Sequence, residues 1–128
     1  MSYFLRLYTS PKRRAGRRAY ILGLVVPFFI AGLAVGFVAR AIPDLAQLFI
    51  LLSFLLMLWP QIVVNIKRLH DIGRSGWWLL GWCGVAFAIS LLPIPHAALF
   101  AQLLSYAGVL LLMTIPGSSA PNQYGVKP

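Results

Sequence analysis

The sequence contains no glutamate and only two aspartates, Asp44 and Asp71, so its 128 residues offer few groups for general acid–base chemistry. Charged residues make up 10% of the chain, against roughly 25% in a soluble domain. Hydrophobic residues make up 60%, and the mean hydropathy is +0.84. The single cysteine, Cys83, excludes an internal disulfide and argues against a thiolate metal site. These shortages indicate an integral membrane protein without a separate soluble domain.

Four apolar segments follow one another, at about residues 20–39, 45–66, 76–93 and 97–115. All but the third have about the 20 residues that a helix needs to cross a hydrocarbon core of roughly 30 Å. The third is shorter and could be tilted, extended by Ser75 or re-entrant. We expect it to span fully, because Pro-Ile-Pro-His after it suits a compact turn between antiparallel helices. The sequence thus predicts an all-α fold, an integral membrane four-helix bundle.

The basic residues, which give a net charge of +9, are distributed unevenly around these segments. Arg40 alone lies on one side of the predicted membrane. The other ten lie on the opposite side: Arg6, Lys12, Arg13, Arg14, Arg17, Arg18, Lys67, Arg68, Arg74 and Lys127. The positive-inside rule therefore predicts a multi-pass membrane protein with both termini cytoplasmic. Because these cations flank apolar segments, anionic membrane lipid is the expected partner and nucleic acid is not.

The predicted bundle, residues 20–115, is flanked by two cytoplasmic segments. Residues 1–19 form a basic arm that could lie on the membrane as an amphipathic helix, and residues 116–128 form a tail. Within the first apolar segment, Gly32 and Gly36 form a GxxxG pattern, which lets another backbone approach closely. This pattern is compatible with packing inside one chain or with a homo-oligomer.

An interfacial loop at 67–76 concentrates the titratable groups of the chain. We expect Gly73 to end a helix, Ser75 to cap the next one, and Asp71 to pair with Arg68 or Arg74. The candidate ligand or headgroup-binding residues are Lys67, Arg68, His70, Asp71, Arg74 and Ser75. Three tryptophans are expected to anchor the following helix at headgroup level: Trp77, Trp78 and Trp82.

A polar stripe precedes this loop, because Gln61 and Asn65 follow Pro60 at helical spacing and share a face with Arg68. Polar groups at that depth prefer the bundle interior or a hydrated cavity. The stripe could supply interhelical hydrogen bonds, or it could form one wall of a cytoplasm-facing site.

The segment Arg68-Leu69-His70-Asp71-Ile72-Gly73-Arg74-Ser75-Gly76-Trp77-Trp78 resembles the signature of a family of small bacterial inner-membrane proteins known as domain of unknown function 805. Gly16-Arg17-Arg18-Ala19-Tyr20 resembles its Gly-Arg pattern before the first span. Pro60 lies at a position similar to that of a proline that commonly precedes the signature in this family. The tail, residues 122–128, resembles its closing Asn-x-Tyr-Gly-x-x-Pro motif, with Asn122, Tyr124, Gly125 and Pro128 at the matching positions. The resemblance implies a multi-spanning inner-membrane fold and no particular activity.

No nucleophile motif, phosphate-binding loop or carboxylate pair is present, so the sequence predicts no catalytic residue and no cofactor. A metal site is not expected, because His96 lies across the predicted membrane from His70. If the protein were an enzyme, His70 and Asp71 would carry the chemistry. The favoured function is that of a structural or interaction protein with a cytoplasmic interfacial site for anionic lipid headgroups or a protein partner. The alternatives are a small transporter or channel subunit and an enzyme that acts on lipid phosphate.

Overall fold

The computed structural model describes residue 8 and residues 13–126. Its four helices are α2 (Arg17–Ala41), α3 (Pro43–Asp71), α4 (Trp77–Ser90) and α5 (Ala97–Thr114). These residues contain no strand, and one isolated bridge joins Asn122 to Gly125 in the tail. The prediction of an all-α fold with four helices is therefore confirmed. Within the expected amphipathic arm, residues 1–7 and 9–12 fall outside the described residues, as does Lys127. Residues 13–16 are not helical, and residues 17–19 form the start of α2.

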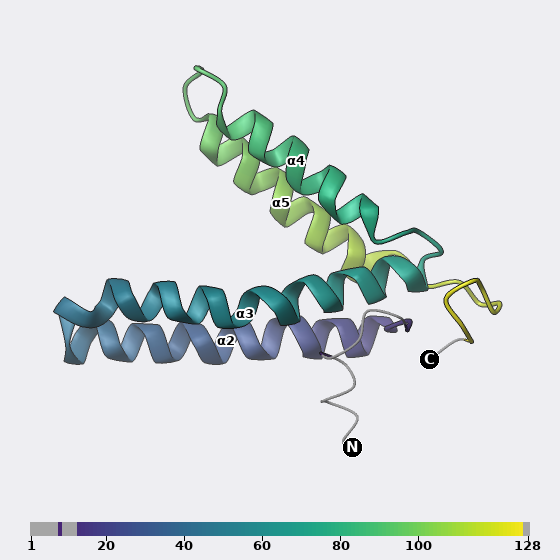
Figure 1. Cartoon of the computed structure of the whole chain (residues 1–128), viewed down its shortest axis with the longest axis horizontal. Helices are drawn as coiled ribbons and strands as arrows, with labels where there is room; N and C mark the ends of the chain where they lie inside the picture. The colour runs from purple at the N-terminus through teal and green to yellow at the C-terminus, as the bar shows by residue number, and fades with distance from the viewer. Residues whose placement is uncertain (1–7, 9–12, 127–128) are drawn as a thin grey trace.

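The helices form two hairpins that meet at one end (Figure 1). α2 packs along α3, and α4 packs along α5. The hairpins join where α3 leads into α4, and they diverge from there, so that their turns lie far apart (Figure 1). The beginnings of α2 and α4 and the ends of α3 and α5 therefore gather at one place, which we call the junction.

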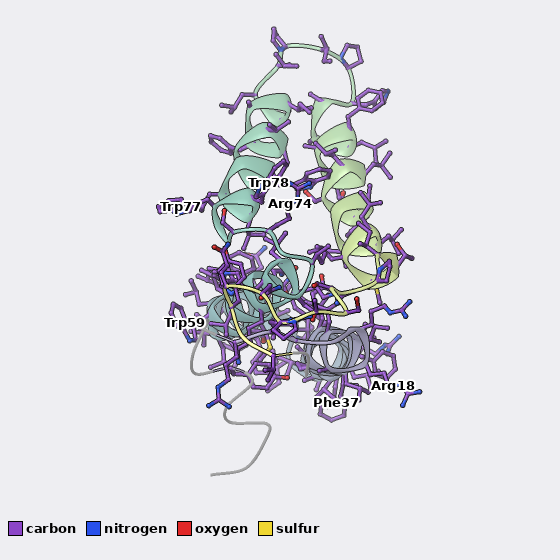
Figure 2. All side chains as sticks on the ribbon, turned by 90° about the vertical axis from the view of Figure 1, so that its right-hand side faces the viewer. Arg18, Phe37, Trp59, Arg74, Trp77 and Trp78 are labelled. Atoms are coloured by element: carbon purple, nitrogen blue, oxygen red, sulfur yellow. The ribbon has the colours of Figure 1, made fainter. Side chains whose placement is uncertain are left out.

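The helices present apolar side chains outward along almost their whole length, as Figure 2 shows for Phe37 and Trp59. A water-soluble protein rarely exposes so large an apolar surface. α2, α3 and α5 are long and apolar enough to cross a membrane, which makes this a membrane protein. α4 is apolar but has 14 residues, a rise of about 21 Å at 1.5 Å per residue. Its full crossing of a roughly 30 Å core stays a prediction.

The buried apolar core lies at the junction, where three helices meet. Its buried members and the α5 residues packed against them are Ala15, Tyr20, Leu24, Val64, Val109, Leu112 and Met113. The Tyr8 side chain also packs here, and its hydroxyl donates a hydrogen bond of 3.1 Å to the Gly23 carbonyl. Burial raises the pKa of Tyr8, so that its phenol stays protonated and able to donate.

The glycine pattern of the first span does not mediate packing within the chain. A Cβ added at Gly32 or Gly36 would meet no atom within 4 Å, so no other helix approaches closely there. The close contact lies at Gly108 of α5, where a Cβ would stand 2.7 Å from Nε1 of Trp82. Packing inside one chain is therefore the wrong interpretation of the GxxxG pattern, and the α4–α5 hairpin depends on a glycine that no pattern singled out.

Candidate functional site

The predicted loop at 67–76 begins as helix, because α3 continues through Asp71. Gly73, at φ 78°, then ends the helix as predicted. Its N–H donates to the His70 carbonyl (3.1 Å), and the Arg74 N–H donates to Leu69 (2.8 Å), the pattern of a Schellman motif. The expected cap by Ser75 is wrong: Gly76 occupies the N-cap of α4, and no side-chain hydrogen bond caps it.

The side chain of Asp71 lies between two arginines at the junction. Its Oδ1 is 3.0 Å from both Nε and Nη2 of Arg14, and its Oδ2 pairs with Nη1 of Arg68. All three residues are buried, with exposed fractions of 6% for Arg14, 0% for Arg68 and 3% for Asp71. We call this group the Arg14–Asp71–Arg68 cluster. One carboxylate faces two guanidinium groups, so the cluster keeps a net charge of +1.

The remaining guanidinium N–H groups of the cluster donate to backbone carbonyls. Arg14 donates to three carbonyls of the tail: those of Ser118, Ala120 and Gly125. Arg68 donates to the carbonyls of Leu112 and Ile115 at the end of α5, and to that of Ala15 before α2. Hydrogen bonds from a charged donor are roughly twice as strong as neutral ones. The cluster therefore ties together four segments that are distant in sequence.

Backbone contacts bring these segments close enough for the cluster to form. The Ala15 N–H donates to the Lys67 carbonyl (3.1 Å), and the Ser118 N–H donates to the Asp71 carbonyl (2.8 Å). The Lys67 side chain is itself buried, at 3% exposure. A Cβ at Gly117 would lie 2.6 Å from Cγ of Asp71, so only glycine lets the tail approach the carboxylate.

The tail folds back on the end of α3. Nδ2 of Asn122 donates to the His70 carbonyl (2.9 Å), and Oδ1 of Asn122 accepts from the Tyr124 N–H (2.9 Å). The Tyr124 ring stacks on the His70 imidazole with centroids 3.7 Å apart and planes 5° apart. Gly125, at φ 120°, turns the chain so that its carbonyl faces Arg14. The closing motif of the tail, Asn122, Tyr124 and Gly125, thus holds the tail against the signature segment, and we call this contact the tail clamp.

The polar stripe of α3 makes one interhelical hydrogen bond, through Asn65. The Tyr20 hydroxyl of α2 donates to Oδ1 of Asn65 (2.8 Å), and Nδ2 of Asn65 donates to the Gln61 carbonyl (2.8 Å). Tyr20 and Asn65 are buried, at 0% and 4% exposure. These contacts agree with the first of the two interpretations of the stripe.

The tryptophans at the start of α4 occupy different environments. Trp77 and Trp78 are exposed, whereas Trp82 is partly buried against Gly108. The Arg74 guanidinium stands 5.2 Å from the centre of the Trp78 ring, within cation–π range. Figure 2 shows Arg74 beside Trp78, with Trp77 projecting away on the other side of α4. Arg74 thus packs on an indole, and the partners of Asp71 are Arg68 and Arg14.

The cluster leaves little room for catalysis by Asp71. Both of its oxygens face guanidinium groups, and its burial keeps substrate away from them. Among the described residues, no three His, Cys, Asp or Glu side chains gather into a group that could hold a metal ion. The arrangement is chemically suited to holding the junction together.

Sequence reasoning missed Arg14 and Gly117. Arg14 lies among five other basic residues of the arm, and no spacing distinguishes it from its neighbours. Its burial follows from the approach of the tail, which is a contact across more than 100 residues. Gly117 lies in a short segment with the composition of an ordinary linker.

Comparison with known proteins places the chain among uncharacterised relatives. Two proteins of Escherichia coli, from strains K12 and O157:H7, are both described as uncharacterized protein YiiR. Each is 28% identical to this chain over 137 residues, which cover 91% of this chain and 84% of the relative. No solved structure matches the chain. Residues 8–126, which include the cluster, all four helices and the tail clamp, match the family described as "Protein of unknown function (DUF805)", and the chain belongs to that family.

Proposed function

We propose that this chain is a non-enzymatic, multi-pass protein of the bacterial inner membrane whose cytoplasmic face binds anionic lipid headgroups. Both termini lie on that face. The exposed arginines at the junction contact the headgroups, and the Arg14–Asp71–Arg68 cluster holds the surface in shape.

The observation that carries the proposal is the imbalance of charge at the junction. Seven described Lys and Arg residues lie there with one acidic residue, Asp71, and that carboxylate is buried between two arginines. Four of the seven are exposed to the surroundings: Arg13, Arg17, Arg18 and Arg74. At the opposite end, Arg40 is accompanied by Asp44, so that end carries no net charge.

The position of the exposed arginines strengthens the attraction for anions. Arg17 and Arg18 occupy the first turn of α2, which contains no acidic residue. The helix dipole places partial positive charge at the same point, so it adds to the field of the two guanidinium groups. Exposed Trp77 and Trp78 lie at this end and suit the headgroup layer.

The proposal changes the set of residues that contact lipid. The candidates suggested by the sequence included Lys67, Arg68 and Asp71. Lys67 is buried, and Arg68 and Asp71 form an ion pair with each other and hydrogen bonds or ion pairs with other parts of the chain. Arg74 keeps its predicted role. His70 is a candidate through its edge, because its ring face is covered by Tyr124.

The experiment compares lipid retention by variants of the purified protein. Native mass spectrometry would count phosphatidylglycerol and phosphatidylethanolamine retained from an equimolar mixture. Each basic residue near a membrane surface contributes about 1 kcal/mol to binding anionic lipid. The triple variant Arg17→Gln, Arg18→Gln and Arg74→Gln should therefore lose on the order of a hundredfold in its preference for phosphatidylglycerol.

Arg40→Gln is the matched control, because it removes an exposed arginine from the opposite end of α2. It should leave the preference unchanged. Raising the salt concentration should weaken the preference of the native protein, as screening predicts. An unchanged lipid preference in the triple variant would refute the proposal.

A further inference from the structure

An apolar groove of about 780 Å³ runs between α3 and α4. Leu58, Ile62 and Ile66 form one wall, and Trp77, Leu80 and Cys83 form the other. Members of each wall are spaced three or four residues apart, so they lie in a line along one face of their helix. The groove exists because the two hairpins meet at the junction and then diverge (Figure 1).

The dimensions of the groove suit a chain-like apolar ligand. From Leu58 to His70, which lies in line with them and lines its end, α3 rises about 18 Å, roughly the depth of one half of a bilayer core. The volume falls within the 300 to 1,000 Å³ that is usual for small-molecule sites. α3 is one of the long apolar helices, so the groove is surrounded by lipid where this helix crosses the membrane.

The end of the groove at the junction is polar. It is lined by His70, Gln123 and Tyr124, and the stacked rings of His70 and Tyr124 fix their positions there. Asn122 holds the tail in place through its bond to the His70 carbonyl. The groove is thus apolar along its length and offers hydrogen-bonding groups at one end, as an amphiphile requires.

The charge around this end selects the kind of amphiphile. The exposed arginines at the junction face no exposed acidic side chain in the described part of the chain, because Asp71 is buried in the cluster. A negatively charged head is therefore favoured over a zwitterionic or cationic one.

We propose that one acyl chain of an anionic phospholipid lies in the groove between α3 and α4, with its headgroup at the His70–Tyr124 end. This inference rests on the proposed function, because the same basic face attracts the headgroup. It adds a defined site for the acyl chain, which surface attraction alone does not require.

Cys83 reports directly on the groove, because it is exposed, lines one wall and is the only cysteine in the chain. The rate of its alkylation by a maleimide can be followed by intact mass in detergent, without lipid and with added phosphatidylglycerol. We expect phosphatidylglycerol to slow the reaction about tenfold or more and phosphatidylethanolamine to slow it less. The control carries Cys83→Ala with Leu103→Cys, which moves the thiol to an exposed position on α5 outside the groove. Its alkylation should not change with lipid.

A second variant fills the groove. Leu80 is 60% exposed and lines the groove, so Leu80→Trp should be tolerated and should reduce phosphatidylglycerol retention in native mass spectrometry. Leu103→Trp is the control and should retain the lipid. Equal alkylation of Cys83 with and without phosphatidylglycerol would overturn the groove proposal, as would equal protection by both lipids. The proposed function survives either result if retention still depends on Arg17, Arg18 and Arg74, so the two failures can be distinguished.

Discussion

Replacing Asp71 by asparagine tests whether the Arg14–Asp71–Arg68 cluster holds the junction together. The substitution keeps the shape of the side chain, so the tight contact with Gly117 is unchanged, but it removes the only negative charge in the cluster. Two guanidinium groups, at 6% and 0% exposure, would then face each other without a counter-charge.

The size of the effect follows from the burial of these groups. Removing one partner of a buried ion pair costs about 3 to 5 kcal/mol, because the remaining charge is left uncompensated. Here two arginines lose their partner, so the upper part of that range is expected. For a chain of this length, 1 kcal/mol corresponds to about 4 °C in Tm, so Asp71→Asn should lower Tm by roughly 16 to 20 °C.

The measurement is thermal unfolding in detergent, followed by tryptophan fluorescence, with limited proteolysis of the tail as a second readout. Asp44→Asn is the matched control, since it neutralises the other acidic residue of the chain, which is exposed in the first turn of α3. It should cost only about 0.3 to 1 kcal/mol through the helix dipole. A shift for Asp71→Asn no larger than that for Asp44→Asn would refute the reasoning.

A double variant measures the energetic coupling between Arg14 and Asp71. Arg14→Met removes one of the two cations that Asp71→Asn leaves unpaired. Arg14→Met should therefore be less costly, by about 0.5 to 3 kcal/mol, when Asp71 is already asparagine. Strictly additive costs would show that Arg14 and Asp71 are not coupled.

Three further outcomes are expected. Gly117→Ala should destabilise the junction and release the tail to protease, because its Cβ would stand 2.6 Å from Cγ of Asp71, whereas Gly32→Ala should be tolerated. Tyr20→Phe should lower the free energy of unfolding by about 1 to 3 kcal/mol, because it leaves Oδ1 of the buried Asn65 without its donor. A free energy of unfolding equal to that of the native protein within measurement error would exclude that bond. Reporter fusions at both termini should place them in the cytoplasm, and a periplasmic signal from either end would contradict the predicted orientation.

The helices could be predicted from the sequence because their signals are local. Apolar runs of about 20 residues specify spans through their length alone, and Gly73 ends α3 through a backbone conformation that favours glycine. The cap of α4 was assigned incorrectly to Ser75, because a serine one residue upstream offers the same local signal as a true cap.

The composition of the candidate site could be predicted only in part. Asp71 and Arg68 are three residues apart on one helix, so their pairing follows from helical geometry. The second partner, Arg14, lies 57 residues from Asp71 and is indistinguishable in sequence from the exposed arginines around it. Its selection depends on where the tail arrives, and no local pattern contains that information.

The location of the cluster follows from how helices associate in lipid. Apolar side chains gain little by leaving lipid for one another, so helix association there depends on close packing and on polar contacts. The two hairpins of this chain touch along little of their length, and their polar contacts are concentrated at the junction. The predicted topology puts the junction at the membrane boundary, where nearby water and headgroups make charges tolerable. The same arrangement leaves the other ends of the hairpins apart, which opens the groove. The cluster that fixes the fold and the groove that could hold a lipid chain are therefore two consequences of joining the hairpins at one end only.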